Sequence, residues 1–153
     1  MDNYAITSLT RANEAIKAGT LMPETAKITI SDRKKGDIEV KDDEQPFNAN
    51  IEKIPSLRPA FKSDGTVTAA NSSSISDGAS ALLLASEDAV KERGLTPMAR
   101  IAGHATNSRD PSEFTIAPVG AIEKLLAKTS WDKSDVDLFE INEAFSMVTM
   151  AAI

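Results

Sequence analysis

The chain has 153 residues, a formal net charge of −6, 41% apolar residues and 26% charged residues. This length suits about one domain, and the composition is that of a soluble globular protein without the roughly 20 consecutive apolar residues of a membrane-spanning helix. The negative charge disfavours a nucleic-acid partner, because binding to a phosphate backbone depends on clustered Lys and Arg side chains. We therefore expect binding to neither nucleic acid nor membrane.

The chain contains no cysteine and a single histidine, His104. Disulfides, thiolate zinc sites and a cysteine nucleophile are excluded within it, and so is a metal site built from several histidines. The first four residues lack the basic and apolar regions of a signal peptide, so the expected location is a cytoplasmic, reducing compartment.

The amino-terminal residues predict an amphipathic helix over residues 2–18, with Asp2 as a possible N-cap and Gly19 as its stop. Its apolar positions recur at spacings of four, three and four residues: Ala5, Leu9, Ala12 and Ile16. Residues 28–30 and 38–40 then alternate between apolar and polar side chains on either side of a turn, which predicts a hairpin with one polar face. Residues 41–65 contain three prolines and predict a loop with short helical pieces.

The apolar run at residues 79–85 fits either a strand or a helix by its period alone. Ser86 decides between them, because a serine before two acidic residues is typical of a helix N-cap, and Gly94 ends the helix that follows. Residues 80–85 are therefore predicted to form a buried strand.

The same alternation continues to the end of the chain. Residues 99–106 predict a strand, Pro118 opens a helix, residues 136–141 predict a further strand, and residues 144–153 predict an apolar helix. Strands that alternate with helices indicate an α/β fold. A helix so near the start and an apolar helix without a C-cap at the end lead us to expect a piece of a larger protein.

Two polar segments lie next to the predicted strands, where open α/β sheets bind ligands. Residues 71–78 (Asn-Ser-Ser-Ser-Ile-Ser-Asp-Gly) precede the first buried strand; they could bind a polar ligand or form a plain serine-rich connection. Asn142 and Glu143 follow the last strand. The Asn142 carboxamide could stabilise an oxyanion or hold a water, or it could simply cap the next helix.

Other groups fit ordinary structural roles better. His104 has no acidic neighbour in the sequence, so we expect a structural or surface histidine. The three basic residues 33–35 could meet a phosphate, but they are more typical of a solvated turn.

Several motifs in the same order resemble the thiolase family over almost the whole chain. They are residues 57–61 (Leu-Arg-Pro-Ala-Phe), 64–69 (Asp-Gly-Thr-Val-Thr-Ala), 71–73 (Asn-Ser-Ser), 77–79 (Asp-Gly-Ala) and 142–145 (Asn-Glu-Ala-Phe). The approach to the helix at residues 116–119 (Ile-Ala-Pro-Val) looks most like the acetyl-CoA acetyltransferases of that family.

The resemblance implies the α/β thiolase fold, in which two similar halves carry an insertion that covers the active site and binds coenzyme A. Residues 1–75 would be the later part of that insertion, residues 76–95 the end of the amino-terminal half, and residues 96–153 the first part of the carboxy-terminal half. The full-length protein would be a homo-oligomer, either a dimer or a tetramer. It would need no cofactor, since coenzyme A thioesters are the substrates.

The implied reaction is the Claisen condensation of two acetyl-CoA molecules or the thiolysis of acetoacetyl-CoA. In that reaction Asn142 would orient a water in the oxyanion site, Ser73 would face the pantetheine or acyl sulfur, and Phe145 would line the acyl pocket. The catalytic cysteines and the Gly-His-Pro histidine of the family are absent from this sequence, so the chain alone should be inactive. Ser72 and Ser76 also replace the family's usual Ala and Asn.

Two alternatives remain open at this point. A 3-ketoacyl-CoA thiolase of fatty-acid β-oxidation would have the same fold and a roomier acyl pocket. A noncatalytic thiolase-like protein that binds acyl-CoA or acts as a scaffold would lack cysteine by nature.

Overall fold

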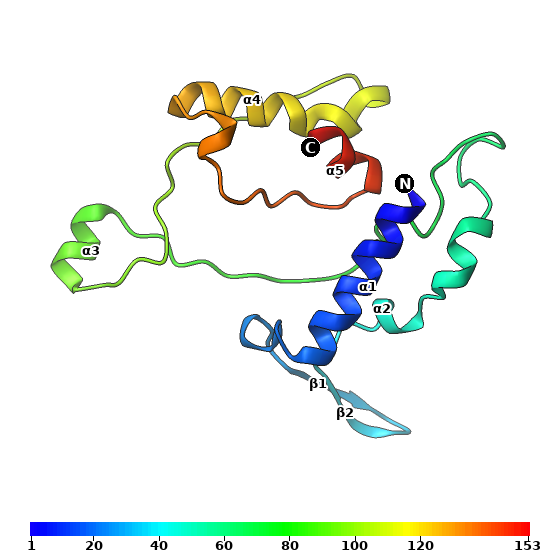
Figure 1. Ribbon diagram of the computed structural model, residues 1–153. Coiled ribbons are helices and arrows are strands. Elements are labelled where there is room, and N and C mark those ends of the chain that lie inside the picture. Colours follow the sequence, from blue (N-terminus) through cyan, green and yellow to red (C-terminus); the bar gives the residue numbers. More distant parts are fainter. The chain divides into compact units, whose positions relative to one another are not determined.

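The computed structural model describes residues 1–153, which divide into two compact units (Figure 1). The first unit is Met1–Ser73 and the second is Ser74–Ile153. Each is held together by contacts of its own.

The first unit is organised along helix α1 (Asp2–Ala18). The helix ends at Gly19, whose φ of 71° is left-handed and therefore favours glycine. The helix and its stop confirm the sequence prediction, but Asp2 is not the N-cap. Met1 occupies that position and Asp2 is the first helical residue. There the negative charge of Asp2 still interacts favourably with the positive end of the helix dipole.

Short helical pieces follow α1 in this unit. They are the 3-10 helices η1 (Met22–Glu24) and η2 (Ile51–Ser56) and the single-turn helix α2 (Gln45–Asn48). Helix α1 contacts α2 and η2, and Asn13 Nδ2 donates a hydrogen bond to the Pro46 carbonyl over 2.9 Å. The buried side chains Ala5 and Ile54 form the small apolar centre of the unit. The predicted loop with helical pieces is confirmed.

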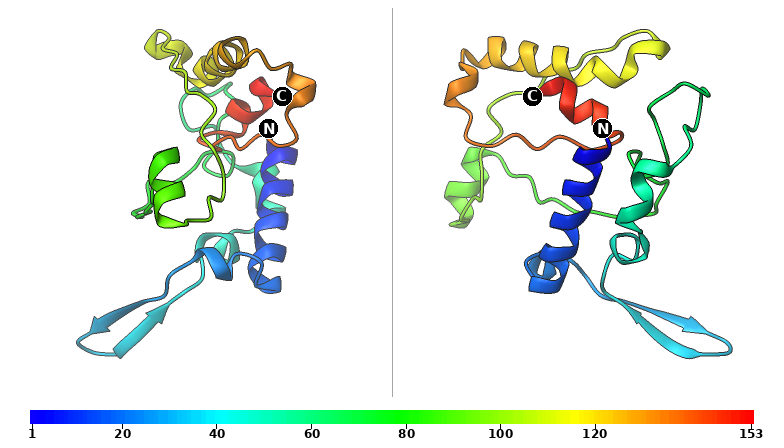
Figure 2. Two further views of the ribbon diagram at one scale, coloured as in Figure 1. Left: turned by 90° about the vertical axis from the view of Figure 1, so that its left-hand side faces the viewer. Right: turned by 45° about the vertical axis from the view of Figure 1, so that its right-hand side comes forward.

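The hairpin of β1 (Ile28–Asp32) and β2 (Gly36–Val40) is antiparallel, as predicted. Ile28 lies opposite Val40 and Ile30 opposite Ile38, so the apolar side chains share one face. Figure 2 shows the hairpin extending away from α1. The three basic residues 33–35 are exposed at its turn.

Asp32 fixes the turn of this hairpin. Its Oδ1 accepts hydrogen bonds from the backbone N–H groups of Lys35 and Lys34, each over 2.8 Å. The bond from Lys35, followed by that from Lys34, lowers the pKa of the Asp32 carboxyl below its ordinary value of 3.8, because both bonds favour the charged form.

The second unit contains three α-helices and two 3-10 helices. They are α3 (Glu87–Arg93), η3 (Pro111–Ile116), α4 (Ala117–Thr129), η4 (Lys133–Asp135) and α5 (Ser146–Ala152). Helices η3, α4 and α5 contact one another. The predicted helix that opens with Pro118 is confirmed, and the last helix is shorter than predicted because it begins at Ser146.

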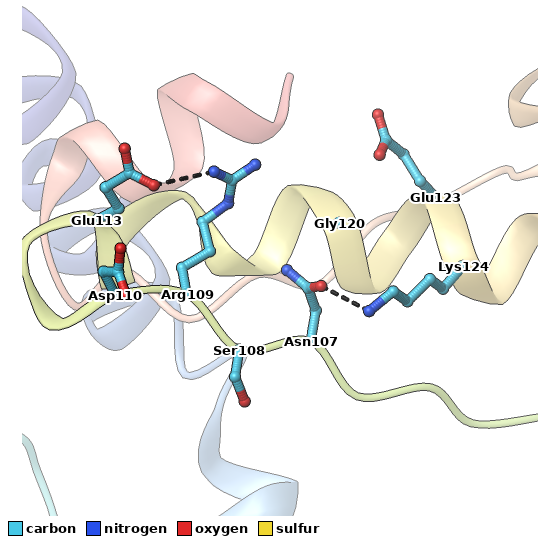
Figure 3. Close-up of a pocket in the computed structure, with 8 residues that line it drawn as sticks. All are labelled: Asn107, Ser108, Arg109, Asp110, Glu113, Gly120, Glu123 and Lys124. Carbon is cyan, nitrogen blue, oxygen red and sulfur yellow. Dashed lines mark hydrogen bonds and ion pairs between the residues drawn. The ribbon is translucent and has the colours of Figure 1, made fainter.

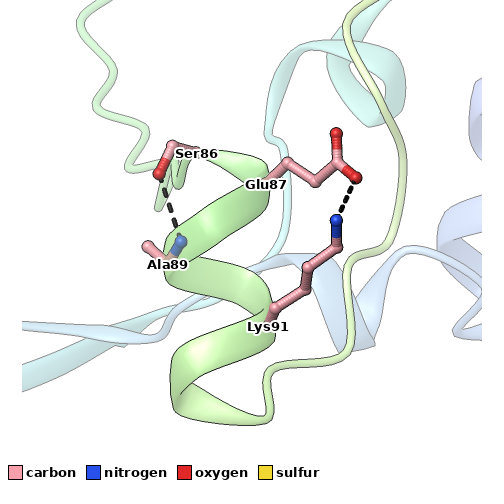
Figure 4. A network of polar contacts seen from close by, with 4 residues as sticks. All are labelled: Ser86, Glu87, Ala89 and Lys91. Carbon is pink, nitrogen blue, oxygen red and sulfur yellow. Dashed lines mark hydrogen bonds and ion pairs between the residues drawn. The ribbon is translucent and has the colours of Figure 1, made fainter.

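Helix α3 forms where its capping residues predict it (Figure 4). Ser86 Oγ accepts a hydrogen bond from the Ala89 N–H over 3.2 Å, and Glu87 and Lys91 form an ion pair over 2.6 Å one turn apart. Gly94 ends the helix with a left-handed φ of 60°. Local signals are sufficient for this helix because both of its ends are capped by adjacent residues.

The prediction of three further strands is wrong for this chain. Residues 80–85, 99–106 and 136–141 form no strand, and the only sheet is the β1–β2 pair. A strand needs a neighbour to pair its backbone N–H and C=O groups, and none lies beside these segments. In consequence the side chains of Leu82, Leu83 and Leu84 are 88%, 91% and 71% exposed.

Candidate functional site

The first polar segment is built around Asn71, which is only 2% exposed. Its Oδ1 accepts a hydrogen bond from the Thr68 N–H over 2.9 Å, and its Nδ2 donates to the Thr66 carbonyl over 2.9 Å and to Asp2 Oδ1 over 3.0 Å. The carboxamide is therefore fully engaged within the first unit. It joins the loop at residues 66–71 to the start of α1, so Asn71 has a structural role.

Ser73 follows this buried loop and is exposed. Its neighbour Ser72 donates a hydrogen bond from Oγ to the Thr68 carbonyl over 2.7 Å, whereas the Ser73 hydroxyl has no partner in the chain. The side chains of Asn71 and Ser72 thus stabilise the loop, whereas the Ser73 hydroxyl is accessible to a ligand.

Asn142 lies in the second unit, near the end of the extended segment that leads to α5. Its side chain is exposed and makes no hydrogen bond to another residue of the chain. The alternative that Asn142 caps the last helix is wrong, because α5 begins at Ser146 and Phe145 occupies the N-cap position. The carboxamide is therefore accessible to a ligand or a water, and it makes no capping hydrogen bond to α5.

Phe145 is half-buried and has an extended backbone, with φ −142° and ψ 148°, before α5. Its ring meets the ring of Phe114 edge to face, with centroids 6.1 Å apart and planes at 66°. Phe114 lies in η3 and was not singled out by the sequence, since its contact with Phe145 joins residues far apart in the chain. Asn142 and Phe145 thus belong to one local structure in the second unit, and Ser73 belongs to the first.

A polar hollow of about 580 Å³ lies beside the first turns of α4 (Figure 3). Two interactions cross it: Arg109 with Glu113 over 3.0 Å, and Lys124 Nζ with Asn107 Oδ1 over 2.7 Å. This group carries no recognisable signal in the sequence, because an Asn-Ser-Arg-Asp-Pro stretch is typical of an ordinary loop.

No metal site stands out in the structure. No group of three or more His, Asp or Glu side chains is arranged to hold a metal ion, and His104 is exposed. None of the helices is both long enough and apolar enough to cross a membrane.

Both parts of the sequence match thiolase family models. Residues 1–88 match the thiolase amino-terminal domain and residues 95–153 match the thiolase carboxy-terminal domain. The chain belongs to the thiolase family.

Similar proteins agree with this assignment. Mitochondrial acetyl-CoA acetyltransferase B of Xenopus laevis is 45% identical over 153 residues, which are 99% of this chain and 36% of that protein. Two solved structures share the fold over 99% of this chain and 38% of their own. They are the Bacillus anthracis acetyl-CoA acetyltransferase (TM-score 0.91, 42% identity) and the human mitochondrial 3-ketoacyl-CoA thiolase (TM-score 0.89, 43% identity).

The fold is therefore that of a thiolase, as the sequence predicts, although residues 80–85, 99–106 and 136–141 form no strand in this chain. The chain spans a little over a third of the length of the relatives it matches.

We expect Asn71→Ala to destabilise the first unit strongly. The substitution removes three hydrogen bonds and leaves the buried Thr68 N–H unsatisfied, which should lower the free energy of unfolding by about 2–4 kcal/mol. Urea denaturation followed by circular dichroism measures this loss.

The matched control is Asn50→Ala. The exposed Asn50 side chain accepts one hydrogen bond from the Glu52 N–H over 3.0 Å, at the start of η2. Its loss should cost about 1 kcal/mol or less. Equal effects of the two substitutions would contradict the structural role of Asn71.

Proposed function

We propose that this chain forms part of a thiolase-type acyltransferase, an acetyl-CoA C-acetyltransferase, and supplies one group of its oxyanion site. The observation that carries the proposal is the Asn142 carboxamide, which is exposed, has no partner in the chain and is not needed to cap α5. It stands in the Asn-Glu-Ala-Phe motif by which the sequence resembles the family.

A carboxamide in this place suits the chemistry of Claisen condensation and thiolysis. Both reactions place negative charge on a thioester or ketone oxygen as the carbon–carbon bond forms or breaks. Asn142 can hold a water whose O–H donates to that oxygen, and a donor held in place before the reaction stabilises the developing charge. The acyl-carrying cysteine, the proton-transferring cysteine and the histidine would come from residues outside this sequence, which has no cysteine.

The other two candidate residues would bind the substrate. The half-buried ring of Phe145 offers an apolar wall for the acyl group, and the accessible Ser73 hydroxyl offers a hydrogen-bonding group near the pantetheine or acyl sulfur. In this proposal residues 1–75 belong to the insertion that covers coenzyme A, residues 76–95 end the amino-terminal half, and residues 96–153 begin the carboxy-terminal half. The active protein would be a dimer or a tetramer.

The exposed apolar segments support a role within a larger fold. Leu82, Leu83 and Leu84 are mostly exposed, and an apolar run of this kind is normally buried between layers of a sheet and its helices. Relatives of which the matched residues make up only 36% to 38% can supply the missing strands.

A second candidate function is a 3-ketoacyl-CoA thiolase that accepts longer acyl chains. It is favoured by the human 3-ketoacyl-CoA thiolase, whose identity of 43% equals that of the acetyltransferase structure within one percentage point. Relative kcat/KM for acetoacetyl-CoA and for longer 3-ketoacyl-CoA substrates separates the two candidates, and we expect acetoacetyl-CoA to be preferred.

We expect the 153-residue chain on its own to show no thiolysis of acetoacetyl-CoA. Covalent catalysis by a thiolase needs a thiolate, and the chain has no cysteine. The measurement is a coupled assay against a heat-inactivated control, in a preparation free of host thiolase. Turnover above the control would show that these 153 residues themselves contain a nucleophile, which would contradict the proposal.

In the complete thiolase, we expect Asn142→Ala to lower kcat by about 10² to 10³ and to change KM much less, because the lost donor acts mainly in the transition state. Steady-state kinetics measure both constants. Thermal stability should stay near that of the parent protein, since Asn142 caps no helix.

Ser86→Ala is a suitable control for this experiment, because it removes an exposed cap hydrogen bond from α3, outside the insertion and the proposed site residues. Near-normal kcat in Asn142→Ala, together with a lower Tm, would show that Asn142 is structural and that the catalytic assignment is wrong.

A further inference from the structure

Asn107 connects the loop before η3 to the junction between η3 and α4. Its Nδ2 donates a hydrogen bond to the Ala117 carbonyl over 3.0 Å, and its Oδ1 accepts one from Lys124 Nζ over 2.7 Å. Figure 3 shows the side chain directed at α4 and the link to Lys124. Both ends of the carboxamide are therefore engaged, so its orientation is fixed.

Gly120 allows this close approach. A Cβ atom at this position would lie 2.5 Å from Asn107 Nδ2 and 2.8 Å from Asn107 Cγ. These separations are far shorter than a van der Waals contact. Glycine is a poor residue for a helix interior, and here its missing side chain makes room for the Asn107 carboxamide.

The junction held by Asn107 also holds Phe114. The Ala117 N–H donates to the Phe114 carbonyl at the end of η3, so a single residue, Ala117, carries both this bond and the bond from Asn107. The Phe114 ring in turn meets the Phe145 ring edge to face. A continuous set of contacts thus runs from Asn107 through Ala117 and Phe114 to Phe145.

We propose that Asn107, seated on Gly120, is a positioning residue that sets the place of the Phe114–Phe145 ring pair. The proposal rests on the proposed function, in which Phe145 lines the acyl pocket. Asn107 itself touches neither substrate nor reacting atoms. It acts by fixing the junction of η3 and α4, and a shift of this junction moves the aromatic wall on which the acyl group rests.

Three substitutions in the complete thiolase test the proposal. Asn107→Ala removes both hydrogen bonds. Asn107→Asp keeps the acceptor for Lys124 but loses the donor to the Ala117 carbonyl. Gly120→Ala favours the helix intrinsically and displaces the Asn107 side chain. We expect each to lower kcat/KM for acetoacetyl-CoA by about tenfold, because small displacements of substrate-positioning groups are costly.

The most direct test is to introduce Asn107→Ala into a protein that already carries Phe114→Ala. Once the Phe114 ring is absent, Asn107 has nothing left to position, so adding Asn107→Ala should lower kcat/KM by less than about twofold. The matched control is Ser86→Ala, which also removes one side chain–backbone hydrogen bond from the second unit but leaves the ring pair untouched. It should leave kcat/KM unchanged.

Full additivity of the effects of Asn107→Ala and Phe114→Ala on kcat/KM would overturn the proposal, and so would a normal kcat/KM in Gly120→Ala.

Crystal structures of Asn107→Asp and Gly120→Ala give a readout that does not depend on activity. We expect the ring centroids to leave their 6.1 Å separation, and an unchanged ring pair in both variants would refute the positioning role. If the ring pair moves but the parent protein has no thiolase activity, the proposed function fails and the structural part of the inference stands.

Discussion

Hydrogen bonds from side chains to backbone groups hold the local structure of the second unit, because its extended segments have no sheet in which to pair. Asn107 donates to the Ala117 carbonyl, Lys128 Nζ donates to the His104 carbonyl over 3.1 Å, and Asp132 accepts from the Ser134 N–H over 2.9 Å. The bond from Asn107 matters most, because it is partly buried and unpaired backbone groups are costly where water is excluded, whereas the bonds of Lys128 and Asp132 are exposed. The place of the Phe114–Phe145 pair depends on one of these bonds.

The same constraint explains which structures the sequence could predict. The hairpin at residues 28–40 and the helix after Ser86 form as predicted, because alternation, an N-cap and a left-handed glycine act within a few residues. The strand at residues 80–85 does not form, although its apolar pattern is as strong. Strand formation depends on a partner distant in the sequence, and periodicity carries no information about whether that partner is present.

The candidate site shows a similar division. Residues 71–73 and 142–145 stand out in the sequence by composition and by their resemblance to a family, but composition could not separate structural from accessible groups. The structure makes this separation: Asn71 is buried with three partners, whereas Ser73 and Asn142 are exposed. Asn107 and Gly120 could not be found from the sequence, because their relation is a close approach in space between a loop and a helix.

Membership of the thiolase family and the exposed Asn142 carboxamide both support the proposed function, in which this carboxamide serves an acyl-transfer reaction. The cellular location is a separate matter. The cytoplasmic location expected from the sequence stays a prediction, and the Xenopus relative is named as a mitochondrial protein.

The most direct test of the central claim is a crystal structure of the complete thiolase with an acyl-CoA substrate bound. We expect the Asn142 carboxamide to hold an ordered water at hydrogen-bonding distance, about 3 Å, with the same water donating to the thioester oxygen. We also expect residues 80–85 and 136–141 to be paired within a sheet. An Asn142 side chain that points into solvent away from the thioester would contradict the assignment of this residue to the oxyanion site.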